Sequence, residues 1–239
     1  MKTWPGRLGN ALRPALIDKV ERDHRQSDRE FLRRRIVVGI TLAIGATLLG
    51  ISLNVPPDSA IFYPLTIGLA ATWVIGGFAS GPLHLGRINF RGELRRPIIT
   101  PILLGLALAA VFILGAVVVR NIEPLRNITE NILAFARYGS LPLVAIITLM
   151  NGIAEEIFFR GALFAAIGTW HPVAISTVIY TLTTVATGNV MLVFSAALLG
   201  VLLGLQRRAS GGILGPILTH CTWSMTMLLV LPPVFAAAG

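Results

Sequence analysis

The sequence predicts an all-α, polytopic membrane helix bundle of seven transmembrane helices, or eight if the connection 120–140 also enters the bilayer. Three observations favour this fold class. The 239 residues are 54% hydrophobic and only 13% charged, whereas a soluble domain carries about 25% charged residues. The mean hydropathy is +0.76, and the charges gather between long apolar runs. This composition excludes both an ordinary soluble domain and a disordered chain.

Seven apolar runs define the expected helices. A spanning helix needs about 20 apolar residues, within a range of about 17–25. The fifth and sixth runs are at the short end of this range, so their boundaries are the hardest to place. The runs are 36–53, 60–79, 98–119, 141–168, 172–187, 190–206 and 213–235.

The basic residues predict the orientation. With the N-terminus inside, sixteen Lys and Arg lie on the inner side and three on the outer side, which fits the positive-inside rule. The sixteen are ten residues of 1–35 with Arg87, Arg91, Arg95, Arg96, Arg207 and Arg208, and the three are Arg120, Arg126 and Arg137. We therefore expect a cytoplasmic basic extension over 1–35, partly helical, and a membrane domain over 36–239 of a multi-pass protein.

Charge and composition also indicate the surroundings of the protein. The net charge of +9 lies at the ends of the apolar runs, which fits a lipid bilayer as partner and not nucleic acid. Eighteen Arg against two Lys suggest a bacterial source, and hence the plasma membrane. The connection 120–140 is expected to be a surface helix, with apolar Leu133 and Phe135 opposite charged Arg126 and Arg137. Gly200 and Gly204 have the spacing that lets membrane helices pack closely.

The fourth run carries two acidic residues where none is expected. A carboxylate in the middle of a bilayer costs at least about 2.5–3.5 kcal/mol on insertion scales, so Glu155 and Glu156 are candidates for function. Glu156 and Arg160 are four residues apart and can pair across one turn, an arrangement that can also simply hold the bundle together. Asn151 and Glu155 are also four residues apart, and they lie on a face about 100° round the helix from Glu156 and Arg160. Glu155 therefore has no charge partner on its own helix.

A histidine in the last run completes the candidate site. His220 lies well inside 213–235, with Ser224 one turn further on, whereas the other three histidines lie in the tail, in a connection and at a turn. Taken alone, His220 fits a buried neutral histidine bonded to a carbonyl. Because Glu155 lies at a comparable depth on another helix, we expect the two side chains to meet.

These residues resemble the motifs of a known family. Glu155-Glu156-Ile157-Phe158-Phe159-Arg160-Gly161 has the form EExxxRG, which is similar to the first motif of the CPBP family, the CAAX prenyl protease and bacteriocin-processing (Abi) intramembrane proteases. The resemblance covers a core of about 140–235. His220 followed four residues later by Ser224 resembles the third motif, in which the family has Asn or Asp at the second position. The family's middle motif places a histidine four residues after an aromatic residue, but here Tyr180 is followed by Thr184.

The resemblance implies a mechanism. Glu155 would activate a water molecule for attack on a peptide bond near the cytoplasmic half of the bilayer, and Glu156 and Arg160 would order the site. A catalytic zinc keeps three protein ligands, and Glu155 and His220 supply two. One divalent metal, Zn²⁺, on these two residues is therefore one possibility. A metal-free site, with His220 stabilising the oxyanion, is the other.

Two other functions stay open. The missing histidine allows a catalytically inactive CPBP relative that acts as a membrane scaffold or regulator of another envelope protein. A small proton-coupled transporter would also use intramembrane carboxylates, but no inverted repeat is visible and both acids lie on one helix. The expected polar core is formed by the helices that carry Glu155, Thr184 and His220, with Asn151 and Ser224 in support.

Overall fold

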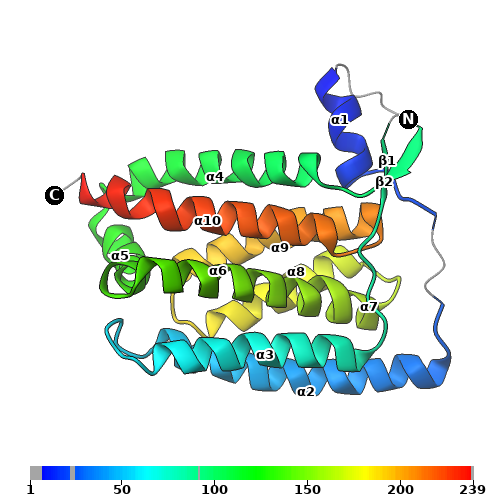
Figure 1. The fold of residues 1–239 in the computed structure, drawn as a ribbon, viewed down its shortest axis with the longest axis horizontal. Coiled ribbons are helices and arrows are strands. Elements are labelled where there is room, and N and C mark those ends of the chain that lie inside the picture. Colours follow the sequence, from blue (N-terminus) through cyan, green and yellow to red (C-terminus); the bar gives the residue numbers. More distant parts are fainter. Residues whose placement is uncertain (1–6, 22–24, 91, 238–239) are drawn as a thin grey trace.

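The computed structural model describes residues 7–21, 25–90 and 92–237, and these are mostly helical (Figure 1). Six helical segments in the described part are long and apolar enough to cross a membrane. They are α2 (Asp28–Leu53), α3 (Phe62–Ser80), α4 (Ile99–Val119), the segment Leu141–Ile167, α9 (Val190–Ser210) and α10 (Leu214–Ala236). A mostly helical, multi-pass membrane protein follows from this arrangement, and the predicted all-α fold is modified by one short two-stranded sheet.

The fifth expected span, 172–187, is a short helix in the structure. α8 (Pro172–Val185) has 14 residues, which extend over about 21 Å at 1.5 Å per residue, less than the roughly 30 Å of a bilayer core. It begins after His171, whose φ of 41° is left-handed, and it ends before Gly188, whose φ is 69°. α8 starts where the predicted run 172–187 starts, and it ends at Val185 instead of 187, ahead of the turn at Gly188.

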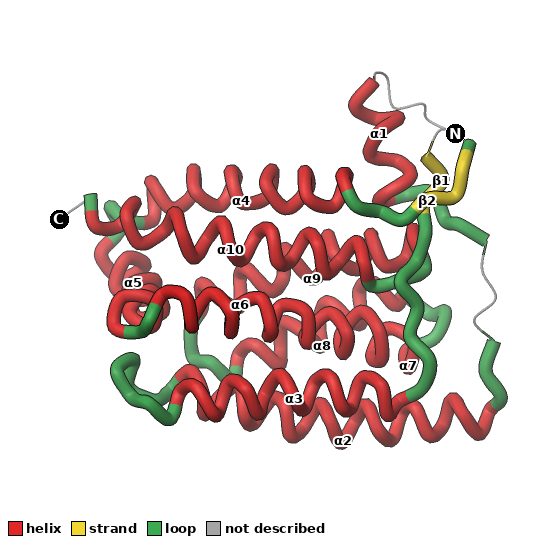
Figure 2. The backbone as a smooth tube through the Cα atoms, in the orientation of Figure 1, coloured by secondary structure: helices red, strands yellow, loops and turns green. Residues whose placement is uncertain are grey.

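The two ends of the bundle differ in structure. One end, here called the hairpin end, carries α1 (Arg7–Leu16) and the antiparallel strands β1 (Ile88–Phe90) and β2 (Glu93–Arg95). The opposite end, the α5 end, carries α5 (Glu123–Tyr138) and the C-terminal end of α10 (Figures 1 and 2). α5 buries Leu133 and Phe135 and is not among the candidate spans, so the helix predicted in the connection 120–140 is confirmed, and its place at the membrane surface stays a prediction.

Two helices extend beyond their predicted bounds at the hairpin end. α2 begins at Asp28, inside the predicted tail, because Ser27 caps it: the Ser27 hydroxyl accepts the Glu30 N–H, and the Glu30 carboxylate accepts the Ser27 N–H. α9 continues to Ser210, so Arg207 lies in the helix and not in the predicted connection. Its side chain is buried and its Nε donates to the carbonyl of Arg160 at 2.6 Å.

Close contacts at glycines bring neighbouring helices together. A Cβ on Gly200 would lie 2.7 Å from Cγ2 of Thr177, and one on Gly204 would lie 3.1 Å from Cγ1 of Val173. The predicted close packing at these two glycines, here between α9 and α8, is confirmed. A Cβ on Gly45 of α2 would overlap the ring of Trp73 of α3, so this glycine also allows two helices to pack closely. The short α8 is thus held inside the bundle beside the acidic residues.

Candidate active site

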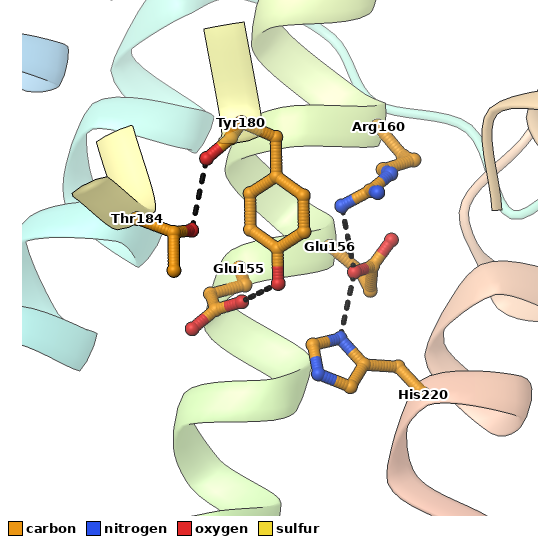
Figure 3. Close-up of polar contacts among 6 residues, drawn as sticks. All are labelled: Glu155, Glu156, Arg160, Tyr180, Thr184 and His220. Carbon is orange, nitrogen blue, oxygen red and sulfur yellow. Dashed lines mark hydrogen bonds and ion pairs between the residues drawn. The ribbon is translucent and has the colours of Figure 1, made fainter. Parts of the chain in front are cut away.

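Glu155 and Glu156 lie where the helical segment Leu141–Ile167 changes its pitch. α6 (Leu141–Glu155) is α-helical, the next eight residues (Glu156–Leu163) form a π-helix, and α7 (Phe164–Ile167) closes the segment. π-Helical turns are rare and occur frequently at functional sites. Figure 3 shows the consequence: Glu155 points toward α8 and Glu156 points toward α10.

Glu156 is the centre of a buried ion cluster. Its Oε1 accepts from Nη1 of Arg160 at 3.0 Å, as the spacing of the two residues predicted, and it lies 2.8 Å from Nδ1 of His220. The three residues are 0%, 1% and 6% exposed. Because this carboxylate oxygen accepts both hydrogen bonds, Nδ1 of His220 carries a proton, and Nε2 is the ring nitrogen left for other contacts.

Glu155 is bonded to a different partner. The hydroxyl of Tyr180 on α8 donates to Oε2 of Glu155 at 2.7 Å. The Tyr180 ring packs beneath the guanidinium of Arg160 at 4.6 Å and beside the ring of Phe159 at 4.7 Å. Tyr180 therefore joins both carboxylates to one cluster, since Arg160 contacts Tyr180 and Glu156 together.

The site residues surround a pocket of about 160 Å³. Thr184, in the place of the histidine that the motif predicts, contributes its side chain to the lining, but its hydroxyl donates to the carbonyl of Tyr180 at 2.9 Å. The side chains that face the pocket include Trp73, Glu155, Tyr180, Thr184, His220 and Trp223. The pocket has room for a few water molecules, each of which takes about 30 Å³ in the liquid.

Three predicted site residues are placed differently from expectation. Glu155 and His220 line the same pocket, but the hydrogen bond of His220 is to Glu156 and not to Glu155. Ser224 lines a second, larger pocket instead. Asn151 donates to the carbonyl of Ile147 at 3.0 Å, and its buried Oδ1 has no partner. The helix pitch and tilt that cause these differences are set by tertiary packing.

Tyr180 is the site residue that the sequence reasoning missed. The signal was present, because Tyr180 is the aromatic residue four positions before Thr184 in the middle motif. The middle motif was interpreted only through the histidine that Thr184 replaces, and its aromatic residue was given no role. Trp73 and Trp223 also line the pocket, and no pattern in the sequence pointed to either.

The donor set does not fit a complete catalytic zinc site. Zinc in such sites keeps three protein ligands. In the described chain no three His, Cys, Asp or Glu side chains are grouped to hold a metal. Glu155 and Nε2 of His220 are two donors, whereas Oε1 of Glu156 is engaged by Arg160 and His220. The hydroxyl of Thr184 is a poor third ligand.

Fold and site together define a class of protein: a multi-pass membrane protein with a polar Glu–Arg–His site buried inside the helix bundle. Residues 137–226 match the family model described as "Type II CAAX prenyl endopeptidase Rce1-like". This match agrees with the resemblance to the CPBP family that the motifs predicted, and the matched family is one of CAAX-type intramembrane proteases. The matched range includes Glu155, Glu156, Arg160 and His220. No curated protein and no solved structure matches the chain.

Proposed function

We propose that the protein is an intramembrane endopeptidase that cleaves membrane-associated proteins or peptides, with Glu155 as the general base. The observation that carries the proposal is the pocket in which Glu155 and His220 face a common space. Tyr180 holds Oε2 of Glu155, which leaves Oε1 for a water molecule. A positioned base of this kind contributes about 10²–10⁴-fold to a rate.

The proton path follows from these contacts. Glu155 takes a proton from the water as its oxygen attacks the carbonyl carbon of the substrate. His220 in its imidazolium form stabilises the resulting oxyanion through Nε2–H, while its Nδ1–H stays bonded to Glu156. The carbon–nitrogen bond then breaks, and the proton on Glu155 passes to the leaving amine. Arg160 compensates the charge of Glu156 throughout.

A second function is favoured by one observation. Thr184 stands where the family motif has a histidine, and its hydroxyl is engaged by the backbone of its own helix. A catalytically inactive relative that regulates another envelope protein would tolerate this loss. For both functions we expect a bacterial plasma membrane, with the N-terminus in the cytoplasm as the distribution of basic residues predicts.

The experiment uses purified protein in liposomes, incubated with membrane proteins from a strain that lacks the gene. New N-termini are identified by mass spectrometry. The wild type and the control Glu93→Gln, which alters an exposed ion pair, are expected to generate the same new N-termini. Glu155→Gln is expected to generate none. Equal cleavage by Glu155→Gln would exclude Glu155 as the base, and an absence of cleavage by the wild type would favour the inactive relative.

A further inference from the structure

A second pocket adjoins the site pocket and is much larger. It has a volume of about 510 Å³, within the range of about 300–1,000 Å³ typical of ligand pockets. It lies between α4 and α9 over α10, and side chains of α5 close it at the α5 end. We call it the vestibule. Leu53, Leu192, Ser195 and Trp223 line both pockets, so the two spaces are neighbours across these side chains.

The hairpin side of the site is closed by packing. Phe158, Phe159 and Arg160 are at most 1% exposed, and buried Arg207 bonds to the carbonyl of Arg160. The large space that borders the site pocket is the vestibule, whereas Phe158, Phe159 and Arg160 pack tightly on the hairpin side.

The outer rim of the vestibule faces the surroundings of the bundle. Val111 of α4 and Phe194 of α9 are 61% and 53% exposed. Phe112 bridges the gap between the two helices: its ring centroid lies 6.0 Å from that of Phe194 and 5.2 Å from that of Trp223. Aromatic contacts of this kind are worth about 0.5–1.5 kcal/mol, which is small enough to open and close.

We propose that the vestibule is a lateral entrance through which an apolar segment of a membrane-embedded polypeptide reaches Glu155 from the bilayer. The segment passes between α4 and α9, and the Phe112–Phe194 contact is the gate. This inference rests on the proposed function and names the route and class of its substrate. It places the entrance toward the α5 end, whereas the sequence alone suggested cleavage near the cytoplasmic half of the bilayer.

The chemistry of the two pockets favours a polypeptide as the occupant. The vestibule offers apolar walls for side chains, and the site pocket offers hydroxyl oxygens from Ser195, Thr184 and Thr187. Each hydroxyl donates to a backbone carbonyl, at 2.7, 2.9 and 2.8 Å, and the Thr187 oxygen also accepts the Asn189 N–H at 3.2 Å. Each oxygen therefore keeps at least one lone pair that can accept a peptide N–H. A hydrocarbon tail would use none of these acceptors.

The test measures access and does not depend on proteolysis. A cysteine is introduced by Ser195→Cys in a Cys221→Ser background, and its reaction with a lipid-soluble maleimide is followed in liposomes. The matched probe is Ser210→Cys, a buried position on the same helix. The blocking variant is Gly115→Trp, because Gly115 lines the vestibule and a Cβ there has no neighbour within 4 Å. Its control is Gly39→Trp, whose Cβ is equally unobstructed.

Ser195→Cys is expected to react at least about 10-fold faster than Ser210→Cys, because buried sites react only through local opening. Gly115→Trp should slow this reaction by about 10-fold, and Gly39→Trp should leave it unchanged. Equal labelling with and without Gly115→Trp would overturn the proposal. Labelling that begins only after lipid is extracted would assign the vestibule to a bilayer lipid and also overturn it. Glu155→Gln tests the proposed function separately, since labelling needs no catalysis.

Discussion

The hydroxyl of Tyr180 lies 2.7 Å from Oε2 of Glu155 and joins α8 to α6 at the candidate active site. A hydrogen bond to a charged group is worth about 1.5–3 kcal/mol. The bond fixes one carboxylate oxygen and turns the other toward the pocket. Tyr180 is in this account a positioning residue for the general base.

Removal of this hydroxyl should slow catalysis without weakening substrate binding. Tyr180→Phe keeps the ring that packs against Phe159 and Arg160 and loses only the bond to Glu155. The expected result is a fall in kcat of about 10- to 100-fold with KM unchanged, corresponding to the bond energy above. Tyr138→Phe, at a residue that is 73% exposed, is the matched control. A kcat for Tyr180→Phe equal to that of the wild type would remove Tyr180 from the mechanism.

The Glu156–Arg160 pair should matter for stability as well as for activity. Arg160→Leu leaves a buried carboxylate with His220 alone, and breaking a buried pair costs about 3–5 kcal/mol. Thermal unfolding in detergent should show a large fall in Tm. Arg95→Leu breaks an exposed pair with Glu93 and should change stability by less than about 1 kcal/mol.

The double variant Glu156→Gln/Arg160→Leu separates charge from packing. It carries no unpaired carboxylate, so its Tm should lie above that of Arg160→Leu alone. A double variant that is less stable than Arg160→Leu would show that the charge of Glu156 is not the cause of the loss.

Packing between α8 and α9 should depend on Gly200. A Cβ at this position would lie 2.7 Å from Cγ2 and 3.2 Å from Cα of Thr177, so Gly200→Ala forces the helices apart. Overpacking of this kind costs about 1–3 kcal/mol. Gly39→Ala adds the same methyl group where nothing lies within 4 Å, and it should not destabilise the fold. Equal unfolding temperatures of the two variants would show that α8 and α9 do not rely on this contact.

The sequence predicts most of the helical framework because its information is local. Apolar runs locate the six long helices, and the four-residue spacing predicts the bond between Glu156 and Arg160. The same spacing could not predict the π-helix from Glu156 to Leu163, since its wider turns depend on packing around Phe158 and Phe159. Nor could it predict that α8 ends at Val185, before the turn at Gly188, and is too short to count as a candidate span.

The pairing of His220 shows where depth arguments fail. Counting residues from the helix ends puts Glu155 about 20 Å and His220 about 12 Å from the cytoplasmic face, so the prediction that they meet needed tilt or a helix break. Depth also does not determine which of two adjacent carboxylates faces α10. The contact with Glu156 follows from the rotation of the segment Leu141–Ile167 about its helix axis. Ser224 is turned away from the site pocket by the same kind of rotation.

Activity should be insensitive to zinc chelators, because the described donors supply two of the three ligands that a catalytic zinc needs. Incubation with 1,10-phenanthroline should leave the rate of the wild type unchanged. Thr184→His adds a third donor to the pocket wall, and elemental analysis should then find about one zinc per chain. Loss of wild-type activity with chelator and its recovery on adding Zn²⁺ would instead support the metal site on Glu155 and His220.

The central claim, that Glu155 activates water for peptide hydrolysis, is tested most directly in cells. Protein N-termini in the membrane fraction are compared among the wild type, a deletion strain and a strain that carries Glu155→Gln, with equal protein levels verified by immunoblot. The account predicts that Glu155→Gln accumulates the same uncut proteins as the deletion. If the deletion changes the membrane N-termini while Glu155→Gln matches the wild type, the claim is contradicted and the protein acts by binding a partner.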